Sequence, residues 1–280
     1  MSRWPEKTIF TNNIKINYYR TGGDKPPVVI NHGAGDDGLC WTRVVQELEA
    51  DYDVIMPDMR GHGKSDSGHG DYTTQQRVAD LAGLINTLKL DRPVVGGHSM
   101  GADSSLNLAS EYPHIARAIF LEDPPIFLPG EPLFGGDQFK GKDVAKMMRQ
   151  FMSLFKKLPR FMGLPLARKM NPSYTADEII PIVDANKRLS SDFINSMSMF
   201  DFNSVDPLSV ISKIEVPVLL IIGDKEKMSI VSTETANKAA QANSKVQIVH
   251  LKGASHNIRR TRFDGYMPAL KQFLKEVYSE

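Results

Sequence analysis

Short apolar runs alternate along the chain with longer stretches in which apolar residues recur every three or four positions. The apolar runs lie at residues 27–30, 54–56, 93–95, 118–121, 218–222 and 246–249. Runs that are apolar on both faces are typical of parallel strands covered by helices on each side. The amphipathic stretches at 78–88 and 266–277 have the spacing of helices with one buried face. This alternation predicts a mostly parallel, doubly wound α/β sheet.

The beginning of the chain has a different pattern. Ile14, Ile16 and Tyr18 alternate with polar residues, which is typical of an antiparallel strand with one exposed face. We expect this strand at the edge of the sheet. Ligands of doubly wound sheets bind beyond the carboxyl ends of the strands, so the residues that follow each apolar run are the ones to examine for chemistry.

The strand–helix alternation stops between residues 127 and 206, where Pro and Gly separate helical pieces. We therefore expect residues 1–126 and 207–280 to form the core and 127–206 to form a helical cap insertion. Seven of the 13 Met and seven of the 13 Phe fall within 139–202. The core of the insertion is expected to include Met147, Met148, Met152 and Phe155, which could also provide an adaptable lining for an apolar ligand.

Charge and cysteine content exclude several classes of protein. Lys and Arg number 34 and Asp and Glu 33, which gives a net charge of +1. This balance lacks the basic excess that marks a nucleic-acid-binding protein. The single cysteine, Cys40, rules out an internal disulfide and a thiolate-cluster metal site. We expect no metal, no cofactor and no nucleic-acid partner.

The sequence offers no obvious targeting or membrane-spanning segment. Residues 1–7 carry charge without a following apolar signal core, and the longest strongly apolar stretch, 218–222, is far too short to cross a bilayer. We expect a cytoplasmic protein with no membrane partner. The sequence does not predict an oligomeric state.

The strongest chemical signal is the pentapeptide Gly97-His98-Ser99-Met100-Gly101 between an apolar run and a helical stretch. Glycines two residues before and after a serine are what a sharp strand-to-helix turn requires, because side chains there would collide with backbone. The turn leaves the Ser99 hydroxyl exposed near a helix N-terminus, whose free N–H groups favour developing negative charge. Ser99 is the predicted nucleophile.

Nearly the whole chain resembles cap-bearing serine hydrolases of the α/β-hydrolase superfamily, related to esterases, lactonases and carbon–carbon bond hydrolases. Residues 97–101 resemble the nucleophile elbow of that family. Residues 32–35 resemble its oxyanion loop, residues 58–66 the loop after its fourth strand, and residues 253–256 the late loop that carries the histidine. The pieces occur in the family's order, so the resemblance implies the α/β-hydrolase fold.

A serine hydroxyl needs a base that removes its proton. His256 has the best placement, after the last apolar run and just before the C-terminal helix. His32 and His62 are expected to brace backbone, and His98 is expected to point away from the nucleophile. His256 is therefore the predicted general base.

The carboxylate that orients the histidine has several candidates. Many members of the family place it three residues after the glycine that ends the penultimate strand, which implies Glu226, with Asp224 nearby. Other members take it from the strand after the nucleophile helix, about 24 residues past the serine, and Asp123 has that spacing. We favour Asp123 over Glu226 and Asp224, with Glu122 last.

The resemblance assigns the oxyanion-hole donors to the backbone N–H groups of Ala34 and Met100. The sequence therefore predicts a cofactor-free serine hydrolase that cleaves a small-molecule ester or lactone through an acyl-enzyme on Ser99. The apolar insertion suggests a bulky, even macrocyclic, substrate. Dehalogenases and epoxide hydrolases of this architecture use a carboxylate nucleophile, which Ser99 argues against.

Two further functions stay open at this point. A carbon–carbon bond hydrolase or an acyl transferase would use the same three side chains. A ligand-binding receptor would keep the pocket but show little turnover.

Overall fold

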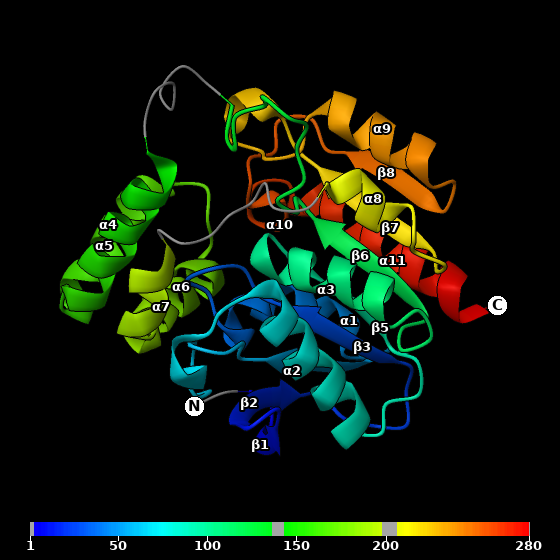
Figure 1. Cartoon of the computed structure of the whole chain (residues 1–280). Coiled ribbons are helices and arrows are strands. Elements are labelled where there is room, and N and C mark those ends of the chain that lie inside the picture. Colours follow the sequence, from blue (N-terminus) through cyan, green and yellow to red (C-terminus); the bar gives the residue numbers. More distant parts are fainter. Residues whose placement is uncertain (1–2, 136–142, 198–205, 280) are drawn as a thin grey trace.

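The computed structural model describes residues 3–135, 143–197 and 206–279, and within them eight strands form one sheet (Figure 1). Its strand order is β1-β2-β4-β3-β5-β6-β7-β8. β3 to β8 run parallel to their neighbours, whereas β2 pairs antiparallel with both β1 and β4. The strands are β1 (Glu6–Thr11), β2 (Ile14–Arg20), β3 (Pro27–Asn31), β4 (Asp53–Pro57), β5 (Val94–His98), β6 (Ala118–Glu122), β7 (Val218–Ile222) and β8 (Val246–His250). The α/β-hydrolase fold predicted from the sequence is confirmed.

Helices cover both faces of this sheet because its central strands are apolar on both sides. One face packs on α2 (Thr74–Thr87), α3 (Met100–Glu111), α8 (Pro207–Ile211) and α9 (Thr233–Ala242). The other face packs on α1 (Thr42–Leu48) and α11 (Phe263–Ser279). The short α10 (Ile258–Thr261) leads into α11. Two apolar cores result, one on each face.

The expectation of an edge strand at Ile14–Tyr18 was wrong. These residues lie in β2, and the edge is β1, which pairs with β2 from Glu6↔Tyr19 to Thr11↔Ile14. The three apolar side chains are buried against α2, as the alternation predicts, but Asn17 and Tyr19 on the other face are buried as well. β1 carries the exposed edge, and its Phe10 is 72% exposed.

Of the described helices between β6 and β7 in the sequence, α8 packs on the sheet and the other four form a group beside it (Figure 1). They are α4 (Val144–Lys157), α5 (Arg160–Met170), α6 (Ala176–Arg188) and α7 (Ser191–Ser196). Three of these helices, α4, α5 and α6, share a small apolar core that is centred on Phe155, Ala167 and Val183. Residues 136–142 and 198–205 of the predicted insertion lie outside the described residues.

Among the described residues, none of the helices combines the length and the hydrophobicity that crossing a bilayer would require.

Candidate active site

Ser99 occupies the bend between β5 and α3, with φ 51° and ψ −116°. This is a backbone region that non-glycine residues rarely adopt. The flanking glycines are required by packing, because a Cβ on Gly97 or Gly101 would lie 2.4 Å from the carbonyl oxygen of Asn31. The bend is anchored by the Ser99 N–H, which donates to the carbonyl oxygen of Glu122 at 3.0 Å. Ser99 is therefore held at the N-terminus of α3, where the free helix N–H groups create positive potential.

The loop that follows β3 passes directly beside Ser99. A Cβ on Gly33 would lie 3.4 Å from the Ser99 Cβ and 2.6 Å from the His98 ring. Ala34 comes next in this loop and lines the same cavity as Met100 and Ser99. Met100 is the first residue of α3, so its N–H has no acceptor within the helix. The two predicted donor residues are thus brought to one cavity.

Two buried histidines brace this loop, as expected from the sequence. His32 accepts the N–H of Met59 through Nε2 at 2.9 Å, and its Nδ1 contacts the carbonyl oxygen of Gly33. His62 accepts the N–H of Gly35 through Nε2 at 3.2 Å. Burial lowers the pKa of both imidazoles. They therefore remain neutral near pH 7, as an acceptor nitrogen requires.

His256 lies in the loop between β8 and α10, and its Nδ1 is 2.6 Å from Oδ2 of Asp123. The ring also lies 4.5 Å from the ring of His98, centroid to centroid. His98 contacts the carbonyl oxygen of His256 through Nε2 at 3.0 Å, which helps to hold the loop. Since Nδ1 is occupied by Asp123, Nε2 is the nitrogen left for a substrate or for Ser99, which lines the same cavity.

Asp123 directly follows β6, is completely buried and has φ 44°. Its carboxylate accepts hydrogen bonds from the Ser229 hydroxyl at 2.7 Å, the Ile230 N–H at 2.8 Å and the Val231 N–H at 3.0 Å. All three donors come from the loop after β7. These hydrogen bonds satisfy the buried oxygens and hold the carboxylate in a fixed orientation beside the imidazole.

The three alternative acids lie elsewhere. Asp224 receives His250 Nε2 at 2.8 Å and the Gly253 N–H at 2.7 Å. Glu226 is exposed on a short 3₁₀ turn, η5 (Lys225–Lys227). Glu122 is buried and bound by Arg259. Asp123 is thus the one of these four candidates that contacts His256.

Arg259 links three segments of the chain that surround the candidate site. Its backbone N–H and its guanidinium both bind the carboxylate of Glu122, at 2.9 and 3.0 Å, and the guanidinium also reaches Asp36 at 3.1 Å. The same guanidinium lies 4.0 Å from the ring centroid of Trp41. The histidine loop, the end of β6 and the loop after β3 are thereby joined by one buried side chain.

The insertion also contacts the loop after β3. Asn186 of α6 donates to the carbonyl oxygen of Gly35 at 3.2 Å. Arg188 binds Asp37, whose pKa is raised to about 6 by burial and by the nearby Asp58. Neither contact was predicted from the sequence, since no motif marks residues of α6 as partners of a loop some 150 residues away.

The cavity in front of Ser99 has a volume of about 50 Å³. Its wall is mostly apolar and includes Met148 and Met197 of the insertion. Together with Ser99 and His256, the lining comprises Ala34, Arg77, Met100, Asp103, Pro125, Leu133, Phe134, Met148, Met197 and Ile230. Two residues of the lining, Arg77 and Asp103, carry opposite charges and form an ion pair with each other at 2.5 Å. The site is therefore suited to an apolar group.

A metal centre needs several ligating side chains in one place. Within residues 3–135, 143–197 and 206–279, no group of three or more His, Cys, Asp or Glu could hold a metal ion.

Sequence reasoning missed the residues that support the site. Ser229 is a small polar residue in a loop, and nothing in its neighbourhood indicates a role beside Asp123. Arg259 could have been noticed as a buried cation close to His256, but burial cannot be read from a polar stretch. The sequence indicated the candidate side chains Ser99, His256 and Asp123, whereas the residues that support them depend on tertiary contacts.

Comparison with known proteins assigns the family. A family model described as the alpha/beta hydrolase fold matches residues 26–258. An uncharacterised protein of Mycobacterium tuberculosis is 30% identical over 103 residues, so the match spans 37% of this chain but only 30% of that relative's length. N-formylmaleamate deformylase of Pseudomonas putida is 23% identical over 95% of both chains.

A solved structure shows the same fold over almost the whole chain. The crystal structure of E-2-(acetamidomethylene)succinate hydrolase matches 98% of this chain and 100% of its own, with a TM-score of 0.81 and 21% identity. The family match covers far more than half of the sequence. The chain therefore belongs to the alpha/beta hydrolase fold family.

Proposed function

We propose that the protein is a serine hydrolase that cleaves a carboxylic ester or lactone through an acyl-enzyme on Ser99. One observation carries the proposal: Asp123 binds His256 at 2.6 Å, and the other nitrogen of that imidazole is left for a cavity that Ser99 also lines. An imidazole oriented by a buried carboxylate beside a serine is the arrangement that activates a hydroxyl.

In the first half of the reaction, His256 Nε2 takes the Ser99 proton while Oγ attacks the carbonyl carbon. The backbone N–H groups of Ala34 and Met100 hold the resulting oxyanion. Collapse of this intermediate breaks the bond to the alkoxide, which leaves with the proton from His256. In the second half, a water gives its proton to His256 and attacks the acyl group, and Ser99 regains its proton. A lactone would open to a single product.

The substrate we favour carries a small apolar acyl group. A cavity of about 50 Å³ is well below the several hundred Å³ typical of sites for drug-sized ligands. It gives no support to the macrocyclic substrate suggested by the Met- and Phe-rich composition. Met148 and Met197 are flexible side chains that can adapt to substrates of different shape. We propose that residues 127–206 form the cap that sets this size limit.

The direct test is labelling with a fluorophosphonate together with turnover of a short-chain aryl ester. The native protein should be labelled and active, and Ser99→Ala should lose both without loss of thermal stability. Ser153→Ala, in α4 and outside the cavity, is the matched control and should behave as the native protein does. Retained turnover in Ser99→Ala would refute the proposal. Labelling with turnover below about one per minute, slow against ordinary enzymes, would favour a receptor.

A second candidate reaction is hydrolysis of an acyl–nitrogen bond. It is favoured by two relatives that match more than nine-tenths of this chain and are named for N-formylmaleamate and E-2-(acetamidomethylene)succinate. Both names describe a carbonyl bound to nitrogen. The same three side chains would serve, with His256 protonating the leaving nitrogen. Comparing kcat/KM for an ester and an anilide with the same acyl group distinguishes the two reactions.

A further inference from the structure

The outer surface of α4 and α5 exposes large apolar side chains away from the candidate active site. Met147, Phe151 and Leu154 recur at intervals of four and three residues, so they form one stripe along α4, and the half-buried Leu158 directly follows the helix. Leu154 is 49% exposed, and Phe161 of α5 is 76% exposed. Burial of large apolar side chains is the usual source of stability, so their exposure on neighbouring helices needs an explanation.

These side chains are not part of the small core that holds the insertion together. That core is centred on Phe155, Ala167 and Val183, on the faces of α4, α5 and α6 that meet one another. Met148, on a different face of α4 from the stripe, lines the candidate active site. The exposed stripe is therefore an additional apolar face. We call the exposed surface of residues 143–170 the α4–α5 surface.

The α4–α5 surface is also strongly basic. Residues 143–170 contain seven Lys and Arg but one acidic residue, Asp143, which gives +6 in a chain whose total is +1. Arg160 pairs with Asp184 of α6. Among the described residues, five basic side chains of this surface have no ion-pair partner. They are Lys146, Arg149, Lys157, Arg168 and Lys169.

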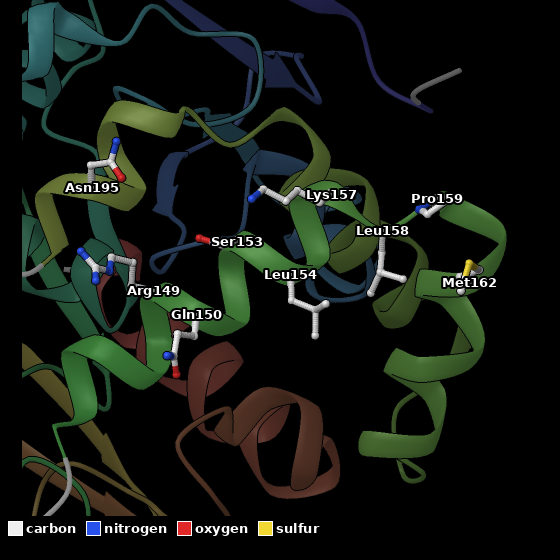
Figure 2. Close-up of a pocket in the computed structure, with 9 residues that line it drawn as sticks. All are labelled: Arg149, Gln150, Ser153, Leu154, Lys157, Leu158, Pro159, Met162 and Asn195. Carbon is white, nitrogen blue, oxygen red and sulfur yellow. The ribbon is translucent and has the colours of Figure 1, made fainter.

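Apolar and basic groups meet in one groove of about 710 Å³ (Figure 2). Its apolar wall is provided by Leu154 of α4, by Leu158 directly after that helix and by Met162 of α5. Arg149 and Lys157 line it as well, and Figure 2 shows Lys157 leaving α4 on the side opposite to Leu154. An apolar strip flanked by cations is the pattern of helices that lie in the interface of a membrane.

We propose that the α4–α5 surface docks the protein onto an anionic lipid bilayer. Charge complementarity selects this occupant. In a two-fold dimer the α4–α5 surfaces of the two copies would face each other. Each surface carries a net charge of +6, so the two would repel. A bilayer containing anionic lipids attracts the cations, and its fluid interior accommodates side chains that protrude irregularly, such as Phe161.

The proposal concerns attachment to a membrane surface. The expectation of no membrane partner rested on the absence of a segment that could span a bilayer. Docking onto the surface of a bilayer does not require such a segment, and none of the described helices could be one. Because Met148 reaches the candidate active site from the same helix, docking would place the site one helix away from the lipid.

Vesicle binding tests the proposal directly. The full chain is mixed with phosphatidylcholine vesicles, either pure or containing about one-third phosphatidylglycerol, and bound protein is measured by sedimentation. We expect binding to the anionic vesicles only, weakened by salt because charges at a surface are screened. Arg149→Gln with Lys157→Gln should weaken binding about 25-fold, since each basic residue near an anionic surface is worth about five-fold. Phe161→Ser should weaken it about ten-fold.

Matched controls separate docking from misfolding and from catalysis. Phe10→Ser removes an equally exposed aromatic from β1, and Lys213→Gln removes an exposed cation after α8. Both should bind like the native protein. Ser99→Ala should also bind normally, so that failure of the proposed catalysis would leave this test intact. Equal affinity for both vesicle types, no binding, or a dimer that Phe161→Ser dissociates would each overturn the proposal.

Discussion

Asn186 of α6 donates a hydrogen bond from Nδ2 to the carbonyl oxygen of Gly35 at 3.2 Å. The two residues are 151 positions apart, and the contact ties the insertion to the loop that carries Ala34. The orientation of the Ala34–Gly35 segment determines whether the Ala34 N–H faces the cavity. A side chain of α6 thus holds the loop that we assign to oxyanion binding.

Asn186→Ala should lower kcat for a short-chain ester while leaving KM nearly unchanged. An oxyanion donor acts mainly in the transition state, and loss of one costs roughly a hundred-fold or more. Asn186 only positions the donor, so we expect a smaller decrease, about ten-fold. Asn171→Ala is the matched control, because Asn171 bonds the Ala167 carbonyl at the end of α5 and makes no contact with the loop. Equal kinetics for the two variants would contradict the positioning role.

Replacing Asp123 by Asn should reduce kcat about 10⁴-fold, because an amide at this position stabilises the wrong tautomer of the histidine. Asp224→Asn and Glu226→Gln should keep near-native kcat, since neither side chain contacts His256. Steady-state kinetics on one aryl ester, with circular dichroism to verify folding, provides the comparison. Full activity in Asp123→Asn together with loss in Asp224→Asn would reassign the acid.

Met148→Ala should move the preferred acyl chain of the substrate toward greater length. Met148 lines the cavity, whereas its neighbour Met147 is 38% exposed on the outer surface. The native protein should show kcat/KM falling as the acyl chain extends beyond about four carbons, because the cavity of about 50 Å³ is full. Met147→Ala should retain that profile. Identical chain-length profiles for all three proteins would mean that Met148 does not limit the site.

The free energy of unfolding should decrease as the pH falls from about 6.5 to 5. Burial lowers the pKa of His32, His62 and His98 in the folded state. Below an unfolded pKa of about 6.5 the unfolded chain therefore binds protons that the folded chain does not. Each such histidine destabilises the fold by at most about 1.4 kcal/mol per pH unit, and only at pH values above its own folded-state pKa.

Asp37 and Asp58 act in the opposite direction. Burial raises the pKa of both carboxyls, that of Asp37 to about 6, so the folded chain gains stability as the pH falls below about 6. Burial raises the pKa of Glu122 as well, so this carboxyl acts in the same direction. The histidines begin to cost stability below about pH 6.5, before protonation of Asp37 begins to add to it, so we expect a net loss. Urea denaturation at several pH values measures it, with exposed His114→Gln expected to follow the native curve. A stability that rises between pH 6.5 and 5 would show that the carboxyls dominate.

The sequence was sufficient for the sheet and for the bend at Ser99 because both have local signatures. Continuous apolar runs indicate buried parallel strands, and the spacing of Gly97, Ser99 and Gly101 indicates a sharp bend. The place of β2 in the sheet was mispredicted because alternation predicts that the second face of the strand is exposed, whereas tertiary contacts bury Asn17 and Tyr19 on that face. Likewise, the contact between Asp123 and His256 joins residues 133 positions apart, so sequence could only rank the candidates.

The arrangement around Asp123 has a consequence for how such a site can change. The end of β6 supplies the negative charge, and the segment after β7 supplies three donors that surround it. These two strands are neighbours. A carboxylate placed after β7 instead of after β6 would therefore reach the imidazole of His256 from almost the same point. Such a change would require only that the two segments exchange roles, one supplying the carboxylate and the other its hydrogen-bond donors, while the rest of the candidate site stays in place.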